Sequence, residues 1–201
     1  NKIINYIKFS DVLLKKGQNK KIYKKNNSIV IMAGGRGERM QPFTSVLPKP
    51  LLPLKNQTVI EKIISNFVEM KFRNFWISIH YKSKIIKSFF EELKPKYNLN
   101  FIEEKFPMGT VGSISLLKGK ITEDFFICNC DTIPNANFDE VLRYHKENKN
   151  ILTIVVASRN ISIPYGICEL DKDGKFSKIN EKPTKSFLIN IGLYLANQKI
   201  F

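Results

Sequence analysis

Short apolar runs alternate with amphipathic helical patterns along the middle of the chain, and this alternation restricts the fold more than any other feature. The apolar runs stand at residues 28–33, 74–80, 99–104, 124–131 and 151–158. Helical patterns stand between them, at residues 58–72, 83–93, 109–119 and 137–148. Strands joined through helices pair in parallel. We therefore predict an α/β fold with a largely parallel sheet and helices on both faces.

The pattern of apolar and polar residues changes after Ala157, where it predicts short strands and turns in place of helices. The segment "YGICELDKDGKFSKINEKP" at residues 165–183 contains the dipeptide Asp173-Gly174 between two strand-like runs. An Asp-Gly pair in that position is a strong hairpin signal. We therefore expect a β-hairpin in this part of the chain.

The two ends of the chain suggest a division into domains. Residues 1–16 read as a strand and the start of a helix, and residues 17–27 are a polar, basic linker. Residues 1–16 faintly resemble the last strand and helix of a CBS module, a nucleotide-sensing regulatory unit. We expect residues 1–27 to be the tail of such a module plus linker, and residues 28–201 to be one domain truncated at its C-terminus.

The chain has 33 Lys and Arg against 18 Asp and Glu, a formal net charge of +15. Such a charge suits polyanionic partners: nucleic acid, a membrane surface or phosphorylated small molecules. The basic residues are scattered and not stacked on one helix, which speaks against nucleic acid. That many of the lysines are simply solvated surface residues remains open.

The three cysteines, Cys128, Cys130 and Cys168, indicate neither disulfides nor zinc. Two lie in one strand-like run, and neither His80 nor His145 stands at a zinc-ligand spacing from them. We expect free thiols in a reducing, cytoplasmic setting. No apolar run approaches the roughly 18 residues of a membrane span, so we expect no membrane partner.

A buried strand that runs directly into "AGGRG" at residues 33–37 is the most informative local feature. Backbone N–H groups without side chains can wrap a phosphate chain, and nearby arginines add positive charge. The P-loop pattern fails, because its Lys and Ser or Thr are missing. The dinucleotide pattern fails as well, since counting from Gly35 its last glycine would fall on Met40. An ordinary tight turn is the alternative to a phosphate loop.

The longer stretch "AGGRGERMQPFTSVLPKPLLPL", residues 33–54, closely resembles the signature of sugar-1-phosphate nucleotidylyltransferases. That signature has a glycine loop, Arg and Pro-x-Thr, followed by Pro-Lys-Pro-Leu-Leu-Pro. Arg39 and Lys49 fall in register with it, and Glu38 departs from it where Thr is commoner. The likeness extends over roughly residues 28–195 and implies a Rossmann-like, doubly wound fold with a mixed sheet flanked by helices.

The resemblance implies a reaction in which a sugar 1-phosphate and a nucleoside triphosphate give a nucleoside diphosphate sugar and pyrophosphate. Arg39 would balance the triphosphate charge and Lys49, stiffened by its prolines, would hold the α- or β-phosphate. Asp131, which ends the strand "FICNCD", would bind Mg²⁺. The alternatives are a solvated loop lysine for Lys49 and a helix N-cap for Asp131.

The resemblance also implies which residues hold the nucleoside. The phosphate loop would supply Ala33, Gly34, Gly35, Arg36 and Gly37. The segment "FPMGTVGSISLLKG" resembles the family's P-x-G-T-A-G-A-L, which implies that Gly109 and Thr110 contact the nucleoside.

Glu104 stands where relatives face the base. A carboxylate accepts hydrogen bonds only, so it suits the N1–H and N2–H₂ donors of guanine. We therefore expect GTP, with dTTP, UTP or CTP as alternatives, and an exposed Glu at a strand end as the structural alternative.

The segment at residues 165–183 and the run "INIGLY" resemble the sugar-side motifs of the same family. They imply that Gly166, Glu181, Lys182 and Asn190 bind the sugar 1-phosphate, with a plain surface lysine as the alternative for Lys182. The family's second metal-binding Asp would follow beyond Phe201, so we expect this piece alone to be impaired.

The implied biology is synthesis of bacterial surface glycans or glycoconjugates in the cytoplasm, with assembly of identical copies left open. A basic nucleic-acid-binding protein and a catalytically dead regulatory relative are the readings from other classes. The first leaves the P-K-P and E-K-P lysines unexplained, and the second conflicts with retention of Arg39, Lys49, Asp131 and Lys182.

Overall fold

The computed structural model describes residues 26–106, 108–109 and 112–201. Of these, residues 26–155 and 191–201 belong to one compact unit, here the sheet unit. Residues 156–190 belong to a second, here the hairpin unit. The CBS-like strand and helix expected at residues 1–16, and the linker up to residue 25, lie outside the described residues.

A six-stranded sheet organises the sheet unit, with the strand order β5-β4-β1-β6-β10-β7. Its strands are β1 (Ser28–Met32), β4 (Asn74–Ile79), β5 (Asn98–Glu103), β6 (Phe125–Asn129), β7 (Leu152–Ser162) and β10 (Thr184–Ala196). Strand β1 pairs in parallel with both β4 and β6, and β4 pairs in parallel with β5. Strand β10 runs antiparallel to β6, which makes the sheet mixed, as predicted.

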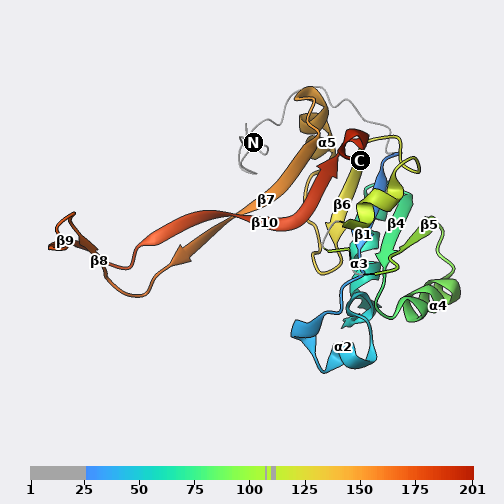
Figure 1. The fold of residues 1–201 in the computed structure, drawn as a ribbon, viewed down its shortest axis with the longest axis horizontal. Helices are drawn as coiled ribbons and strands as arrows, with labels where there is room; N and C mark the ends of the chain where they lie inside the picture. The colour runs from blue at the N-terminus through green and yellow to red at the C-terminus, as the bar shows by residue number, and fades with distance from the viewer. Residues whose placement is uncertain (1–25, 107, 110–111) are drawn as a thin grey trace. The chain divides into compact units, whose positions relative to one another are not determined.

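Strand β1 lies between β4 and β6 inside the sheet (Figure 1), and an apolar cluster packs on each of its faces. Ile29, Val30 and Ile31 have no exposed surface. Ile29 and Ile31 join one apolar cluster and Val30 joins the other, as alternating side chains of a strand must. This explains why the strand reads as an unbroken apolar run.

Three α-helices pack on one face of the sheet: α3 (Val59–Glu69), α4 (Ser83–Leu93) and α5 (Phe138–Glu147). The rings of Phe67 on α3 and Phe138 on α5 lie 4.6 Å apart, centroid to centroid. Helix α3 begins with a capping box, in which Thr58 and Glu61 each accept from the other's backbone N–H. The Thr-x-x-Glu spacing of residues 58–61 is the sequence signature of such a cap.

The other face carries the 3₁₀ helix η3 (Gly112–Leu117). Ile114 and Leu117 of this helix pack into the second apolar cluster. Helices therefore cover both faces, as predicted, but the α-helix expected over residues 109–119 is wrong in type and length. Three glycines and two serines favour turns over a continuous helix there.

The hairpin unit contains the end of β7 and the start of β10, together with β8 (Ile167–Leu170) and β9 (Phe176–Asn180), which pair antiparallel. The Asp171 carboxylate accepts from the backbone N–H groups of Asp173 and Lys175 and so stabilises the turn. Gly174 supplies the left-handed residue, with φ of 76°. The hairpin predicted at Asp173-Gly174 is confirmed.

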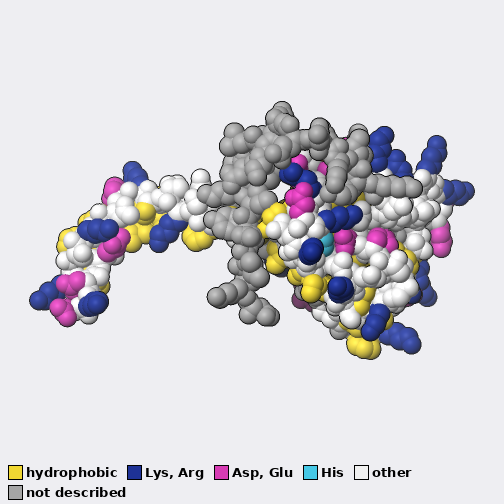
Figure 2. All heavy atoms as spheres, turned by 90° about the horizontal axis from the view of Figure 1, so that it is seen from above, with side chains coloured by type: hydrophobic (Ala, Val, Ile, Leu, Met, Phe, Trp, Pro, Cys, Tyr) yellow, Lys and Arg dark blue, Asp and Glu magenta, His cyan; other side chains and the backbone are white. Residues whose placement is uncertain are grey.

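The remaining elements are short, and most of them follow β1. They are η1 (Glu38–Met40), α2 (Phe43–Val46), η2 (Lys49–Leu51), β2 (Pro53–Leu54), β3 (Gln57–Thr58) and η4 (Gln198–Ile200). Among the described residues, no helix has the length and apolar character needed to span a bilayer. On the face that Figure 2 shows, Lys and Arg side chains are spread out and do not gather over one element.

His145 is a buried polar group that ties α5 to the sheet. Its Nδ1 lies 2.7 Å from Thr153 Oγ1, while Nε2 has no hydrogen-bond partner within the described part of the chain. The nearest charge to Nε2 is Asp124 Oδ1, at 3.8 Å. Burial lowers the pKa of His145 more than the Asp124 carboxylate raises it.

We expect the pH dependence of folding stability to report on His145. The pKa of His145 is lower in the folded chain than in the unfolded one. At pH values between these two pKa values, the unfolded chain therefore binds more protons than the folded chain. Stability contributed by neutral His145 is thus present above about pH 6.5 and is lost as the pH falls towards the folded pKa. In His145→Gln, the stability from pH 7.5 to 5 should fall less steeply than in the unchanged chain. Urea unfolding at several pH values measures both slopes, and parallel curves would contradict the expectation.

Candidate active site

The carboxyl ends of β1, β4, β5 and β6 meet at one edge of the sheet, because these four strands run parallel. Ligands of open α/β sheets bind at this edge. The glycine loop leaves β1, Asp131 follows β6, and Glu104 follows β5. The register brings them close: Cys130 N–H donates to Met32 O, and Ala33 N–H donates to Ser78 O at the end of β4.

The glycine loop is held open and close to the next segment. Gly37 has φ of 67°, and a Cβ added there would lie 3.0 Å from Thr44 Cγ2 and 3.1 Å from Lys49 Cβ. Thr44 Oγ1 donates to Gly37 O at 3.0 Å, which fastens α2 to the loop. Gly35 has nothing within 4 Å of such a Cβ, so space above the loop is open there. Gly37 is therefore required for the close approach of the Lys49 segment, and Gly35 lies on the open side.

The predicted cationic residues Arg36 and Arg39 lie on and just after this loop, Arg39 within η1. Both are exposed, and neither forms a hydrogen bond or ion pair with the described residues. They are free to turn towards a ligand above the loop.

Lys49 and Asp131, 82 residues apart in the chain, form an ion pair at this edge. Lys49 Nζ donates to Asp131 Oδ2 at 2.5 Å, and the two side chains are 20% and 39% exposed. Pro48 and Pro50 on either side of Lys49 are buried. The alternative of a freely solvated lysine is therefore wrong. The N-cap alternative for Asp131 is wrong too, since Asn137 caps α5.

Asp131 offers one carboxylate for a metal ion. No three His, Cys, Asp or Glu side chains within the described ranges cluster closely enough to hold a metal alone. Mg²⁺ usually takes one or two carboxylates and completes its shell with phosphates and water. The residues therefore fit an ion that arrives with a phosphate ligand, and Asp131 would hold it.

The neighbouring thiols do not take part in such chemistry. Burial raises the pKa of Cys128 to about 12 and that of Cys130 to about 11, with the Asp131 charge adding to both effects. Both thiols are protonated at neutral pH, and Cys168 in the hairpin unit is free. All three cysteines are free thiols, as expected.

Glu104 is buried, with 6% of its surface exposed, so the alternative of an exposed strand-end carboxylate is wrong. Its Oε1 accepts from Ser78 Oγ at 2.5 Å, and its Oε2 accepts from the Met108 N–H at 3.2 Å. A Cβ added to Gly34 would lie 2.8 Å from Glu104 Oε1. The carboxylate therefore borders the glycine loop, and Gly34 leaves the room it occupies.

The other predicted nucleoside contacts are placed only in part. Ala33 is buried at the start of the loop, and Gly109 is exposed with φ of 79°. Thr110 lies outside the described residues.

The predicted sugar-side residues Gly166, Glu181, Lys182 and Asn190 belong to the hairpin unit. Within that unit, a Cβ added to Gly166 would lie 2.7 Å from Glu181 Oε2, so the glycine admits the carboxylate. Lys182 is exposed and has φ of 46°, a conformation that costs a non-glycine residue roughly 1–3 kcal/mol. The alternative, that Lys182 is an ordinary surface lysine, stays open.

Two residues that the sequence reasoning missed hold α2 in place. Tyr81 Oη donates to Thr44 O at 3.3 Å, and Lys82 Nζ donates to Ser45 O at 2.6 Å and to Val46 O at 2.7 Å. Lys82 thus satisfies carbonyl groups at the end of a four-residue helix. In a lysine-rich chain, nothing in the sequence distinguishes Lys82 from its neighbours.

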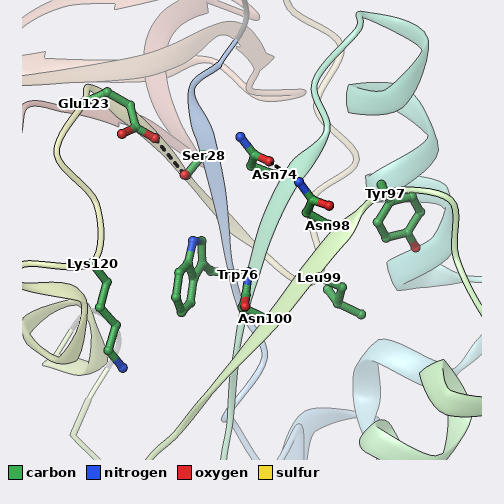
Figure 3. A pocket seen from close by; sticks show the side chains of 9 residues that line it. All are labelled: Ser28, Asn74, Trp76, Tyr97, Asn98, Leu99, Asn100, Lys120 and Glu123. Carbon is green, nitrogen blue, oxygen red and sulfur yellow. Dashed lines mark hydrogen bonds between the residues drawn. The ribbon is translucent and has the colours of Figure 1, made fainter.

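A hollow of about 600 Å³ lies at the opposite edge, where β1, β4 and β5 begin (Figure 3). Four of its polar side chains pair with one another: Ser28 donates to Glu123, and Asn98 donates to Asn74. The Lys120 ammonium lies 5.8 Å from the centre of the Trp76 ring. No predicted site residue lines this hollow, so the carboxyl edge is the candidate active site.

Known families and proteins resemble this chain over most of its length. The family model described as "Nucleotidyl transferase" matches residues 28–201. A mannose-1-phosphate guanyltransferase of Hypocrea jecorina is 31% identical over 180 residues, which are 85% of this chain and 50% of that protein. A probable mannose-1-phosphate guanylyltransferase 3 of Oryza sativa subsp. japonica is 30% identical over 181 residues, with the same coverage. The chain spans about half the length of these curated relatives.

Among solved structures, HddC from Yersinia pseudotuberculosis matches with a TM-score of 0.67 and 25% sequence identity. The match covers 87% of this chain and 78% of that one. It confirms the predicted fold class.

We expect Lys82 to stabilise α2 and the loop segment fastened to it. In Lys82→Met, the amides of residues 43–47 should exchange with deuterium roughly tenfold faster, since hydrogen bonds from a charged donor contribute about 1.5–3 kcal/mol each when well formed. Lys84→Met is the matched control, because Lys84 is an exposed lysine two residues further on, in the first turn of α4. Hydrogen–deuterium exchange by mass spectrometry measures the rates, and equal protection in both variants would contradict the role of Lys82.

Proposed function

This chain belongs to the nucleotidyl transferase family, as its signature at residues 33–54 predicted, and from that premise we propose that its protein is a sugar-1-phosphate nucleotidylyltransferase. It transfers a nucleoside monophosphate from a triphosphate to a sugar 1-phosphate and releases pyrophosphate. The observation that supports this best is the meeting of the glycine loop, Lys49 and Asp131 at one sheet edge. The names of the curated relatives support the same reaction.

In the proposed reaction, an oxygen of the sugar phosphate attacks the α-phosphorus of the nucleotide. A new P–O bond forms there. The bond from the α-phosphorus to the oxygen that bridges it to the β-phosphorus breaks, and that oxygen leaves as part of pyrophosphate. The attacking phosphate is already anionic, so no general base is needed. The protein's work is positioning and charge cancellation.

Lys49 and the two arginines supply the positive charge for this work. The Lys49 ammonium is mounted between two buried prolines and paired with Asp131, so little side-chain freedom remains to be lost. Arg36 and Arg39 are exposed beside the loop and can fork across phosphate oxygens. Magnesium is part of the proposal: held by Asp131, it would neutralise phosphate charge when bound.

The favoured nucleotide is GTP. Glu104 is a buried carboxylate at the glycine loop, and guanine is the base whose edge carries two adjacent donors, N1–H and N2–H₂. The guanylyltransferase names of the relatives point the same way. dTTP, UTP and CTP remain the alternatives.

The sugar side of the proposal rests on Gly166, Glu181, Lys182 and Asn190. Mannose 1-phosphate is the first sugar to test, because the relatives carry it in their names. A cytoplasmic location and supply of activated sugar for bacterial surface glycans stay predictions.

The proposed reaction predicts pyrophosphate release by the full-length protein. With Mg²⁺, we expect turnover for one combination of the four nucleoside triphosphates and a panel of sugar 1-phosphates. Lys49→Met should lower kcat/KM roughly 10²-fold or more, since it removes a positioned charge at the reacting phosphates. Lys96→Met, which removes an exposed lysine, is the control of equal charge. No turnover with any pair, or full turnover in Lys49→Met, would reject the proposal.

The base assignment predicts the behaviour of Glu104→Gln. An amide presents its own NH₂ group towards guanine, so one of the two hydrogen bonds is lost and a donor meets a donor. We expect the ratio of kcat/KM for GTP to that for dTTP to fall roughly 10- to 100-fold. Glu103→Gln is the matched control, because the Glu103 carboxylate is paired with Ser83 and Lys87 at the surface. An unchanged ratio in Glu104→Gln would remove guanine recognition from this residue.

A further inference from the structure

A chain of three buried polar side chains runs from the second face of the sheet to the glycine loop. Ser113 of η3 and Ser78 of β4 have no exposed surface, and Glu104 follows β5. The two serine oxygens lie 2.9 Å apart, and Ser78 Oγ lies 2.5 Å from Glu104 Oε1. Three separate elements therefore converge on one carboxylate.

The order of the hydrogen bonds follows from the number of protons. A hydroxyl carries one proton, and an ionised carboxylate can only accept, so the Ser78 proton goes to Glu104. Ser113 Oγ, 2.9 Å from Ser78 Oγ, restrains the Ser78 hydroxyl from its other side. Ser113 thereby restrains Ser78, and Ser78 restrains Glu104 Oε1.

The carboxylate retains capacity for a ligand. Two carboxylate oxygens offer about four lone-pair sites. One is taken by Ser78 and one by the Met108 N–H, which contacts Oε2. About two sites remain, one for each donor on the guanine edge, and Oε1 already lies against Gly34 of the loop.

We propose that Ser78, itself held by Ser113, is a positioning residue that turns the Glu104 carboxylate so that it distinguishes guanine from hypoxanthine. The proposal rests on the assignment of Glu104 to the base of GTP. The last torsion of a Glu side chain is broad and has no sharp minimum of its own. Because a carboxylate meets N1–H and N2–H₂ together only when both oxygens lie in the plane of the base, the serine chain supplies the missing restraint.

Inosine triphosphate isolates the effect, since it keeps N1–H and the triphosphate but lacks the 2-amino group. The dissociation constants of GTP and of inosine triphosphate are measured by titration calorimetry on the full-length protein with Mg²⁺. We expect the unchanged protein to prefer GTP. Ser78→Ala should reduce that preference roughly tenfold, and Ser113→Ala should reduce it in the same direction by less.

Ser28→Ala is the matched control. Ser28 is also a buried strand serine that donates to a carboxylate, Glu123 Oε1 at 2.9 Å, but it lies at the opposite edge of the sheet. It should leave the ratio of the two dissociation constants unchanged. A merely structural role of Ser78 would weaken both nucleotides equally and leave that ratio intact.

The outcomes separate the two proposals. Equal binding of GTP, inosine triphosphate and ATP by the unchanged protein would overturn the base assignment and this inference with it. A clear preference for GTP that survives in folded Ser78→Ala would overturn the positioning role alone. If Ser78→Ala fails to fold by circular dichroism, Ser113→Ala decides: a reduced preference supports the role and an unchanged one overturns it.

Discussion

The parallel pairing of β1 with β4 on one side and β6 on the other is the constraint on which the rest of the site depends. It sets the carboxyl ends of three strands level, so that a glycine loop, an aspartate and the Tyr81–Lys82 turn leave the sheet side by side. Strand β5 adds Glu104 through its pairing with β4. This register is what brings Lys49 and Asp131, which are far apart in the chain, close enough to form their ion pair.

The repeating pattern made most of the fold predictable. Period-two and period-3.6 patterns are strong where a strand or helix has one clear apolar face, as in β1, α3 and α5. The pattern failed at residues 109–119, because the small residues there pack without a continuous helical stripe and form the 3₁₀ helix η3 instead. The mixed sheet followed from family resemblance, since no local pattern reveals that β10 runs antiparallel to β6.

The candidate site was predictable where a residue type is unusual for its place, and unpredictable where it is ordinary. Three glycines after an apolar strand, and a lysine between two prolines, are uncommon enough to be noticed. Ser78 and Ser113 look like any small residues in a buried strand and a turn, and Lys82 is one lysine among many. Their roles arise from contacts across the sheet or between loops, which sequence spacing does not encode.

The three thiols differ in a way that has a practical consequence. Cys128 is buried and Cys130 is half-buried, and both are neutral thiols, whereas Cys168 is exposed on β8. Alkylating reagents attack the accessible thiolate, so the native chain presents one reactive handle without any mutagenesis. A fluorophore attached there would sit among the residues assigned to the sugar and could follow their environment while the nucleotide edge stays chemically untouched.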